Sequence, residues 1–440
     1  MFASTKAKKG IHNTRIRKGA TLIAALTSIT LLATGCGASG SSSAAPAPGK
    51  DKKYSDFAFT SWNYGEDAAR ALLEEEVAGF TDGKGIKAKF SAYPFAEYRN
   101  QILLRARTGD IDGAAQLDIA DLQSLAQSGK LVNLSAYVPG SDYTDASLKT
   151  GQYEGKQYGL PWYTGSIGLV TNTALLKQAG FDKPPTTIKE FEQVLKSVAA
   201  LGDKYVPYAL ATKPEQVKDF FPWFKTFGSK IVEGDTIAVN DEGAVKALTW
   251  LKSLYDQNLI RLNVGRPEAR TLFSQEQTAF FDDASMVRGT VKKQATNPEL
   301  VNATTPMARP VVAQGDKPQS LAWGSLLVVF DKGAAETSAD FAHFMSSDID
   351  TSLKRYKALG SSPTTNKAIQ DPTYSADPYS ATWQKAVTDT ADPNPLWKFT
   401  NYGQMEAKLA SHIQAALIGE ASPKDALDAA AKEMQDLVGK

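Results

Sequence analysis

The chain has 440 residues, 42% of them hydrophobic and 22% charged, an ordinary globular composition with enough length for two domain-sized cores. Six of the 49 basic residues precede residue 36 and none of the 48 acidic residues does, so the rest of the chain is mildly acidic. Such a body lacks the basic face that nucleic-acid phosphates require, which excludes nucleic acid as an expected partner.

The first 35 residues are predicted to be a targeting segment. A basic stretch at 1–19 precedes an uncharged apolar run at 20–33, which is too short to cross a bilayer and is typical of a secretory signal peptide. The one cysteine, Cys36, follows directly. This arrangement resembles the lipobox of bacterial lipoproteins, except that Ala33 stands where leucine is usual. The resemblance implies that residues 1–35 are removed and that Cys36 carries lipid; a plain secretory signal with an incidental cysteine is the alternative.

Strand and helix patterns alternate after a flexible tether. The Gly/Ser/Ala/Pro-rich stretch within 36–53 cannot bury a core and is predicted to link the lipid anchor to the body. The next patterns are a strand at 57–60, a helix at 69–80, a half-buried strand at 86–91, a helix at about 95–107, a strand at 114–117 and a helix at 122–127. This alternation predicts an α/β domain with a largely parallel sheet, whose ligands bind beyond the carboxyl ends of the strands.

Helical patterns dominate the second half of the chain. A second α/β unit is predicted near 168–172, and Thr187 with Glu190 forms a capping-box pattern for the helix after it. Apolar stripes at 405–417 and 427–438 predict two closing helices. No repeat, heptad array or transmembrane run follows the tether in the sequence.

Motifs for common enzymes and cofactors are absent from the sequence. It has no GxGxxG after a strand, Walker loop, GxSxG or HExxH pattern, and its three histidines lack metal-ligand spacing, so no cofactor or metal is expected. Asp282 and Asp283 are adjacent, so on a strand they point to opposite faces, whereas a glycosidase needs two carboxyls that converge on one bond. We therefore predict that the protein is not an enzyme, with a surface glycosidase or lyase as the alternative.

Aromatic residues carry the remaining signal. The chain has seven tryptophans and 16 tyrosines, many of them beside turn or strand-end residues. Sugar rings present flat C–H faces that stack on indole and phenol rings, and their hydroxyls need acid or amide partners, so this composition predicts a sugar cleft. For any one tryptophan the alternative is core packing, which is the expectation for Trp250 within its helical pattern.

The segment YGLPWYTGSIGLVTN at 158–172 resembles the extracellular solute-binding proteins of carbohydrate ABC importers, the family that includes maltose- and raffinose-binding proteins. Segments similar to this family follow in the family's order at 116–129, 279–283, 322–324 and 360–363. The resemblance therefore covers nearly all of the body.

This resemblance implies a two-lobed, periplasmic-binding-protein-like α/β fold, in which each lobe is a mostly parallel sheet flanked by helices and a hinge of several segments joins them. The predicted lobes are 54–165 plus about 290–328, and about 166–289 plus 329–440. An oligosaccharide would bind between the lobes and close them, and the closed form would dock on the permease subunits of an ABC importer, reaching its ATPase indirectly. The protein is expected to be a monomer outside the cell, held to the membrane by its lipid anchor.

By position, the resemblance also assigns a set of sugar-binding candidates. They are Trp62, Tyr64, Gln116 and Asp118 in the first lobe, Trp162 and Tyr163 at the hinge floor, Trp223 projecting from the second lobe, Asp283 in the place of the family's usual aspartate, Trp323 and Gly324 at the cleft wall, and Arg355 and Trp397 as further candidates. Met286 stands where many members have an aromatic residue and is not a candidate. Trp162 is the first choice because Pro161 restricts the backbone before it; its alternative role is core packing beneath the hinge.

Two other functions stay open beside the enzyme. The site could receive a non-sugar solute such as a peptide, although a peptide receptor needs charged partners for the termini and these candidates are mostly aromatic, amide or acid. A purely adhesive surface protein is the third alternative, and the lack of repeats counts against it.

Overall fold

The computed structural model describes residues 53–439. The predicted signal peptide, Cys36 and most of the predicted tether lie outside the described residues. Within the described range, no helix is both long and apolar enough to cross a membrane.

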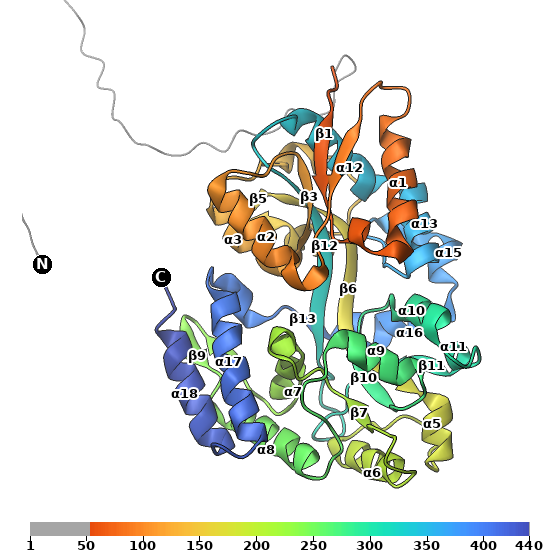
Figure 1. Ribbon diagram of the computed structural model, residues 1–440, viewed down its shortest axis with the longest axis vertical. Helices are drawn as coiled ribbons and strands as arrows, with labels where there is room; N and C mark the ends of the chain where they lie inside the picture. The colour runs from red at the N-terminus through yellow and green to blue at the C-terminus, as the bar shows by residue number, and fades with distance from the viewer. Residues whose placement is uncertain (1–52, 440) are drawn as a thin grey trace, which may run out of the picture. The chain divides into compact units, whose positions relative to one another are not determined.

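A mixed sheet of nine strands runs through the described chain (Figure 1). Its strands lie in the order β2, β1, β3, β12, β6, β10 and β7, with β11 paired to β6 and β13 paired to β12. The strands are β1 (Phe57–Thr60), β2 (Ala88–Ser91), β3 (Ala114–Asp118), β6 (Gly159–Asn172), β7 (Tyr208–Ala209), β10 (Phe280–Asp283), β11 (Thr304–Met307), β12 (Ser320–Val329) and β13 (Ala391–Asp392). Two short hairpins stand apart, β4 (Gln152–Tyr153) with β5 (Lys156–Gln157), and β8 (Ile231–Glu233) with β9 (Thr236–Ala238).

The helices fall into two groups around the two ends of this sheet (Figure 1). With β1, β2 and β3 lie α1 (Asp67–Thr81), α2 (Phe95–Thr108), α3 (Leu122–Gln127), α4 (Asp145–Thr150), α12 (Ala335–Ser347), α13 (Ile349–Leu359), α14 (Asn366–Gln370) and α15 (Pro372–Ser375). With β7, β10 and β11 lie α5 (Thr173–Gln178), α6 (Ile188–Ala199), α7 (Phe221–Thr226), α8 (Glu242–Asp256), α9 (Arg266–Ser274), α10 (Val287–Gln294), α11 (Leu300–Ala303), α16 (Pro378–Ala386), α17 (Tyr402–Leu417) and α18 (Pro423–Gln435).

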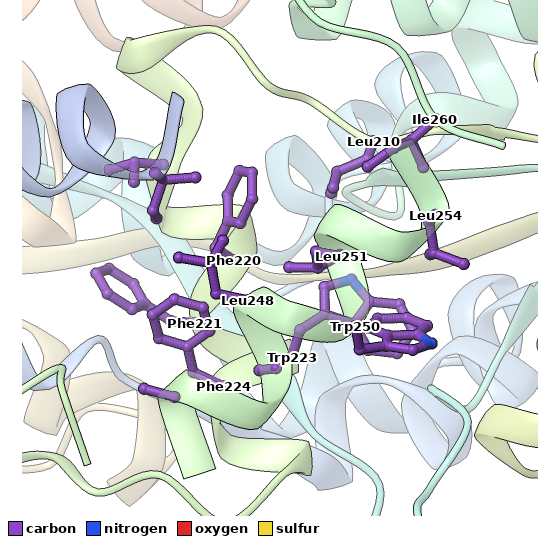
Figure 2. Packing of buried hydrophobic residues seen from close by; sticks show 14 of the residues in the cluster. Leu210, Phe220, Phe221, Trp223, Phe224, Leu248, Trp250, Leu251, Leu254 and Ile260 are labelled. Atoms are coloured by element: carbon purple, nitrogen blue, oxygen red, sulfur yellow. The ribbon is translucent and has the colours of Figure 1, made fainter. Parts of the chain in front are cut away.

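Each group of helices has its own buried core. In the first, Phe57 and Phe59 of β1 share a cluster with Phe341 of α12, and Phe59 lies 4.9 Å from Phe341 between ring centroids. The core of the second group is larger, and Figure 2 shows Trp223 of α7 lying among side chains of α8, including Trp250. Trp250 is buried, as its helical pattern predicted.

Local signals in the sequence begin the helices of the second group where they were expected. The Thr187 hydroxyl accepts a hydrogen bond from the backbone N–H of Glu190, and a Glu190 carboxylate oxygen accepts one from the N–H of Thr187, which closes the capping box of α6. Ser422 caps α18 through the N–H of Asp425. These caps satisfy N–H groups that a helix start otherwise leaves unpaired.

Two long strands connect the two groups. β6 and β12 pair antiparallel from Gly159 opposite Val328 to Ile167 opposite Leu321. A third segment lies against them, because the N–H of Thr164 donates to the carbonyl of Ser362. The two-lobed α/β fold is therefore confirmed, but the sheet is mixed, since β12 runs antiparallel to both β3 and β6. The mostly parallel sheet predicted for each lobe holds for β1, β2 and β3.

The predicted lobe boundaries stay a prediction, and two contacts argue for moving them. The prediction assigned 290–328 to the first lobe, yet β11 pairs with the end of β6 at Leu169–Asn172, the stretch that also pairs with β10. It assigned 329–440 to the second lobe, yet α12 shares its buried cluster with β1. Both contacts favour exchanging β11 and α12 between the lobes.

Candidate functional site

Gln116 joins four strand ends of the first lobe. Its side-chain oxygen accepts a hydrogen bond from Ser61 Oγ at 2.6 Å. Its amide nitrogen donates to Tyr163 OH at 2.7 Å and to Ser325 Oγ at 3.0 Å. Gln116 is fully buried, so it holds β1, β3, β6 and β12 in place rather than offering its amide to a bound molecule.

Trp323 lies on β12 directly opposite Gly165 of β6. A Cβ atom at position 165 would come within 3.1 Å of the indole, so the glycine lets the ring lie against β6. The indole Nε1 donates to Asp118 Oδ2 at 3.1 Å, and the ring centroid lies 5.9 Å from that of Tyr163. Trp323 and Asp118 are both partly exposed, so they form a fixed aromatic and carboxylate pair where the two lobes join. Gly324 is buried beside them, opposite Thr164.

Trp62 and Tyr64 differ in accessibility although they are two residues apart. Trp62 is buried, with its ring centroid 5.4 Å from that of Phe95 and 5.0 Å from that of Tyr98. Tyr64 stacks on Phe90, at 4.2 Å between ring centroids, and stays partly exposed. Tyr64 is therefore the more accessible of the two candidates.

Trp162 lies inside the core of the first lobe, with 1% of its surface exposed. The guanidinium carbon of Arg355 lies 4.4 Å from its ring centroid, and the ring of Phe59 packs at 6.2 Å. Arg355 is itself buried in an ion pair with Glu76, at 2.8 Å between Nη2 and Oε2. Burial raises the pKa of Glu76, and the charge of Arg355 opposes that rise. Trp162 and Arg355 thus stand behind Tyr163, in contacts with each other.

Trp223 does not project from the second lobe as expected, because it is fully buried in the second core (Figure 2). Its Nε1 donates to Tyr208 OH at 3.0 Å, and the guanidinium carbon of Arg309 lies 4.4 Å from its ring centroid. Arg309 forms a buried ion pair with Asp282. Trp397 is also in this core, with 9% of its surface exposed.

Asp283 binds Arg270 through two hydrogen bonds, from Nε at 2.7 Å and from Nη2 at 2.9 Å. Its neighbour Asp282 binds Arg309 instead, so the two carboxylates have separate partners, as expected for adjacent residues on a strand. Asp283 is buried, whereas 30% of the Arg270 side chain is exposed. Arg270 rather than Asp283 is therefore the group that a solute could contact.

Glu66 was missed by the sequence analysis. It follows Tyr64 by two residues at the start of α1 and is exposed. Burial by its surroundings raises the pKa of Glu66, and the positive charge of Arg270 opposes the rise, so the two charges interact between the lobes. The position of Glu66 after a strand end could have marked it, whereas Arg270 lies in a helix whose pattern carries no such signal.

Three further residues missed by the sequence analysis meet at another contact between the two groups of helices. Tyr402 OH donates to Asp121 Oδ1 at 2.6 Å, and Arg99 Nε donates to the same oxygen at 2.6 Å. Asp121 follows β3 by three residues, but nothing in its sequence context distinguishes it from a helix-start acid.

The structure brings five of the candidates together: Gln116, Asp118, Tyr163, Trp323 and Gly324. Trp162 and Arg355 lie behind this group, Asp283 acts through Arg270, and Trp223 and Trp397 lie in the second core. Among the described residues, no group of histidine, cysteine, aspartate and glutamate side chains is arranged to hold a metal ion.

Comparison with known proteins identifies relatives of the whole body. The family model described as "Bacterial extracellular solute-binding protein" matches residues 75–382, which is most of the chain. A binding protein of Brucella abortus (strain 2308) is 24% identical over 257 residues, which cover 55% of this chain and 61% of that protein. The galactooligosaccharide-binding protein of Bacillus subtilis (strain 168) is 23% identical over 377 residues, covering 82% of this chain and 85% of that protein.

Solved structures show the same fold. The GacH receptor of Streptomyces glaucescens, solved unliganded and with acarbose, matches with a TM-score of 0.79 and 19% identity, covering 88% of this chain and 99% of that chain. The fold expected from the family resemblance is confirmed by this match. Because the family model spans most of the chain, the protein belongs to the bacterial extracellular solute-binding proteins, a family that works outside the cytoplasm.

Proposed function

We propose that the protein binds an oligosaccharide between its lobes and delivers it to the permease of an ABC importer. The observation that supports this most is the pair formed by Trp323 and Asp118, a partly exposed indole whose orientation is held by a carboxylate at 3.1 Å. An aromatic face beside fixed polar groups suits a sugar ring and its hydroxyls. The sugars in the names of relatives, a galactooligosaccharide and acarbose, support this class of ligand.

Binding is proposed to close the lobes, because the accessible groups come from both sides. Tyr64 and Glu66 belong to the first lobe, whereas Arg270 belongs to the second. A ligand that contacts all three interacts more strongly with the closed form, and this difference in affinity is what shifts the lobes together. Lobe closure would then present one surface made by both lobes to the permease.

The first prediction is one-site binding without turnover. Residues 51–440 are expected to bind an oligosaccharide from a glycan panel by calorimetry, contract slightly in small-angle scattering, and return the sugar unchanged. Trp323→Ala is expected to weaken binding by about 1–3 kcal/mol, roughly 5- to 150-fold. Tyr255→Ala, a partly exposed aromatic on α8, serves as the matched control and is expected to bind normally.

Two results would overturn this proposal. Steady release of product from the bound sugar would favour the glycosidase or lyase. Binding of peptides but of no sugar would favour a receptor for another solute.

We also propose that Cys36 anchors the protein to the membrane through lipid and that the mature protein is a monomer. The position of the one cysteine after the apolar run and before the tether supports the anchor. Cys36→Ala is expected to release the protein into the medium or to leave unprocessed precursor, as fractionation and mass spectrometry would detect. A variant that stays membrane-bound and fully processed would rule out lipidation.

A further inference from the structure

Tyr402 begins α17 in the second core, yet its hydroxyl reaches the first lobe. It donates to Asp121 Oδ1 at 2.6 Å. Arg99 of α2 donates from Nε to the same Asp121 oxygen at 2.6 Å and to Tyr402 OH at 3.0 Å. Tyr402 packs in the cluster of α7, α8 and α18, whereas α2 packs on β3. These bonds therefore join the two lobes.

Packing at the same place shows that the approach is close. The guanidinium carbon of Arg99 lies 4.5 Å from the Tyr402 ring centroid, within the range of a cation–π interaction. A Cβ atom at Gly403 would come within 2.4 Å of Arg99 Nη1, so the glycine leaves room for the guanidinium. Beside it, Ser124 Oγ donates to the carbonyl of Thr400 at 3.0 Å. Two separate hydrogen-bonded contacts thus span the lobes here.

Charge makes the Tyr402 contact the more important one. Asp121 is buried, and burial raises its pKa while the bonds from Arg99 and Tyr402 oppose that rise. A hydroxyl that donates to a buried carboxylate forms a stronger hydrogen bond than one between neutral groups. When the lobes separate, Asp121 keeps Arg99, which is in its own lobe, but loses the donor from Tyr402. Opening therefore costs the protein this bond.

We propose that the contact of Arg99, Asp121 and Tyr402, the clasp, holds part of the protein closed without ligand and thereby sets ligand affinity. All the clasp atoms belong to the protein, so the clasp favours closure whether or not a sugar is bound. The effect on affinity rests on the proposed function, because only a ligand that binds the closed form is affected. Apparent affinity then scales with the fraction of protein that is closed.

The test measures lobe separation directly in the protein without sugar. Residues 51–440 contain no cysteine, so spin labels at Asn100→Cys on α2 and Lys424→Cys on α18 would be unique. Electron–electron resonance at pH 8 then reports the closed and open populations. This pH is above the pKa of Glu406, a neighbour on α17 that burial raises to about 7, so Glu406 stays mainly ionised.

Tyr402→Phe removes only the hydroxyl and is expected to lower the ratio of closed to open protein about tenfold, and sugar affinity by up to the same factor. Tyr143→Phe is the matched control, because it removes a buried hydroxyl bonded to Ser346 within one lobe. The control is expected to leave the distance distribution unchanged. Ser124→Ala tests the clasp without touching the core and is expected to shift the distribution in the same direction by less.

An unchanged distance distribution in Tyr402→Phe would overturn the clasp. So would an equal shift in Tyr143→Phe, which would mean that opening follows general loss of stability. Because the distances are measured without sugar, failure to bind any oligosaccharide would contradict the proposed function and leave the clasp result standing.

Discussion

Replacing Trp162 with alanine is expected to lower the free energy of unfolding by about 3–5 kcal/mol. The indole is 1% exposed and fills the space between Phe59 and the Arg355 guanidinium. Its removal leaves a cavity beside a buried ion pair, whose charges depend on close packing for their arrangement. Urea unfolding of the variant, followed by circular dichroism, measures this loss.

The same variant separates core packing from sugar stacking. Because Arg355 already lies over the ring, Trp162 has little surface left for a sugar, and the folded variant is expected to bind with nearly unchanged affinity. Trp323→Ala should behave in the opposite way, with a small loss of stability and a large loss of affinity. A Trp162→Ala protein with an unchanged melting temperature and 5- to 150-fold weaker binding would restore Trp162 as the stacking platform.

Elements that depend on local patterns were predictable from the sequence. The capping box at Thr187 and Glu190 and the apolar stripes of α17 and α18 mark helices that the structure contains. The order of crossing segments followed from the family resemblance. What failed was the grouping of β11 and α12, because this depends on pairing with β6 and packing on β1, both of which are distant in sequence.

Site residues were predictable only where strand ends mark them. Tyr64, Asp118 and Trp323 follow or lie on strands that meet between the lobes, and the structure leaves all three partly exposed. Trp162 and Trp223 carry the same residue type, but burial is decided by packing partners that their neighbours in sequence do not reveal. The partners in Glu66 with Arg270, and in Asp121 with Tyr402, likewise come from different lobes.

The ion pair of Arg309 with Asp282 is the most deeply buried charge pair in the second core. Both side chains are 0% exposed, and the Arg309 guanidinium also lies over the ring of Trp223. Tyr208 donates its hydroxyl to the same aspartate. Taking two charges out of water is costly, so each charge depends on the other for compensation.

Arg309→Met is expected to destabilise the protein by about 3–5 kcal/mol, because it leaves the Asp282 carboxylate buried without its cation. The double variant Arg309→Met with Asp282→Asn removes both charges, keeps an acceptor for Tyr208, and is expected to recover most of this loss. Arg70→Met serves as the control, since Arg70 pairs with Asp67 at the surface, where such pairs contribute about 0–1 kcal/mol. Urea unfolding of the four proteins gives the free energies. A loss below about 1 kcal/mol in Arg309→Met, or a double variant no more stable than Arg309→Met, would show that the pair does not hold the second core together in this way.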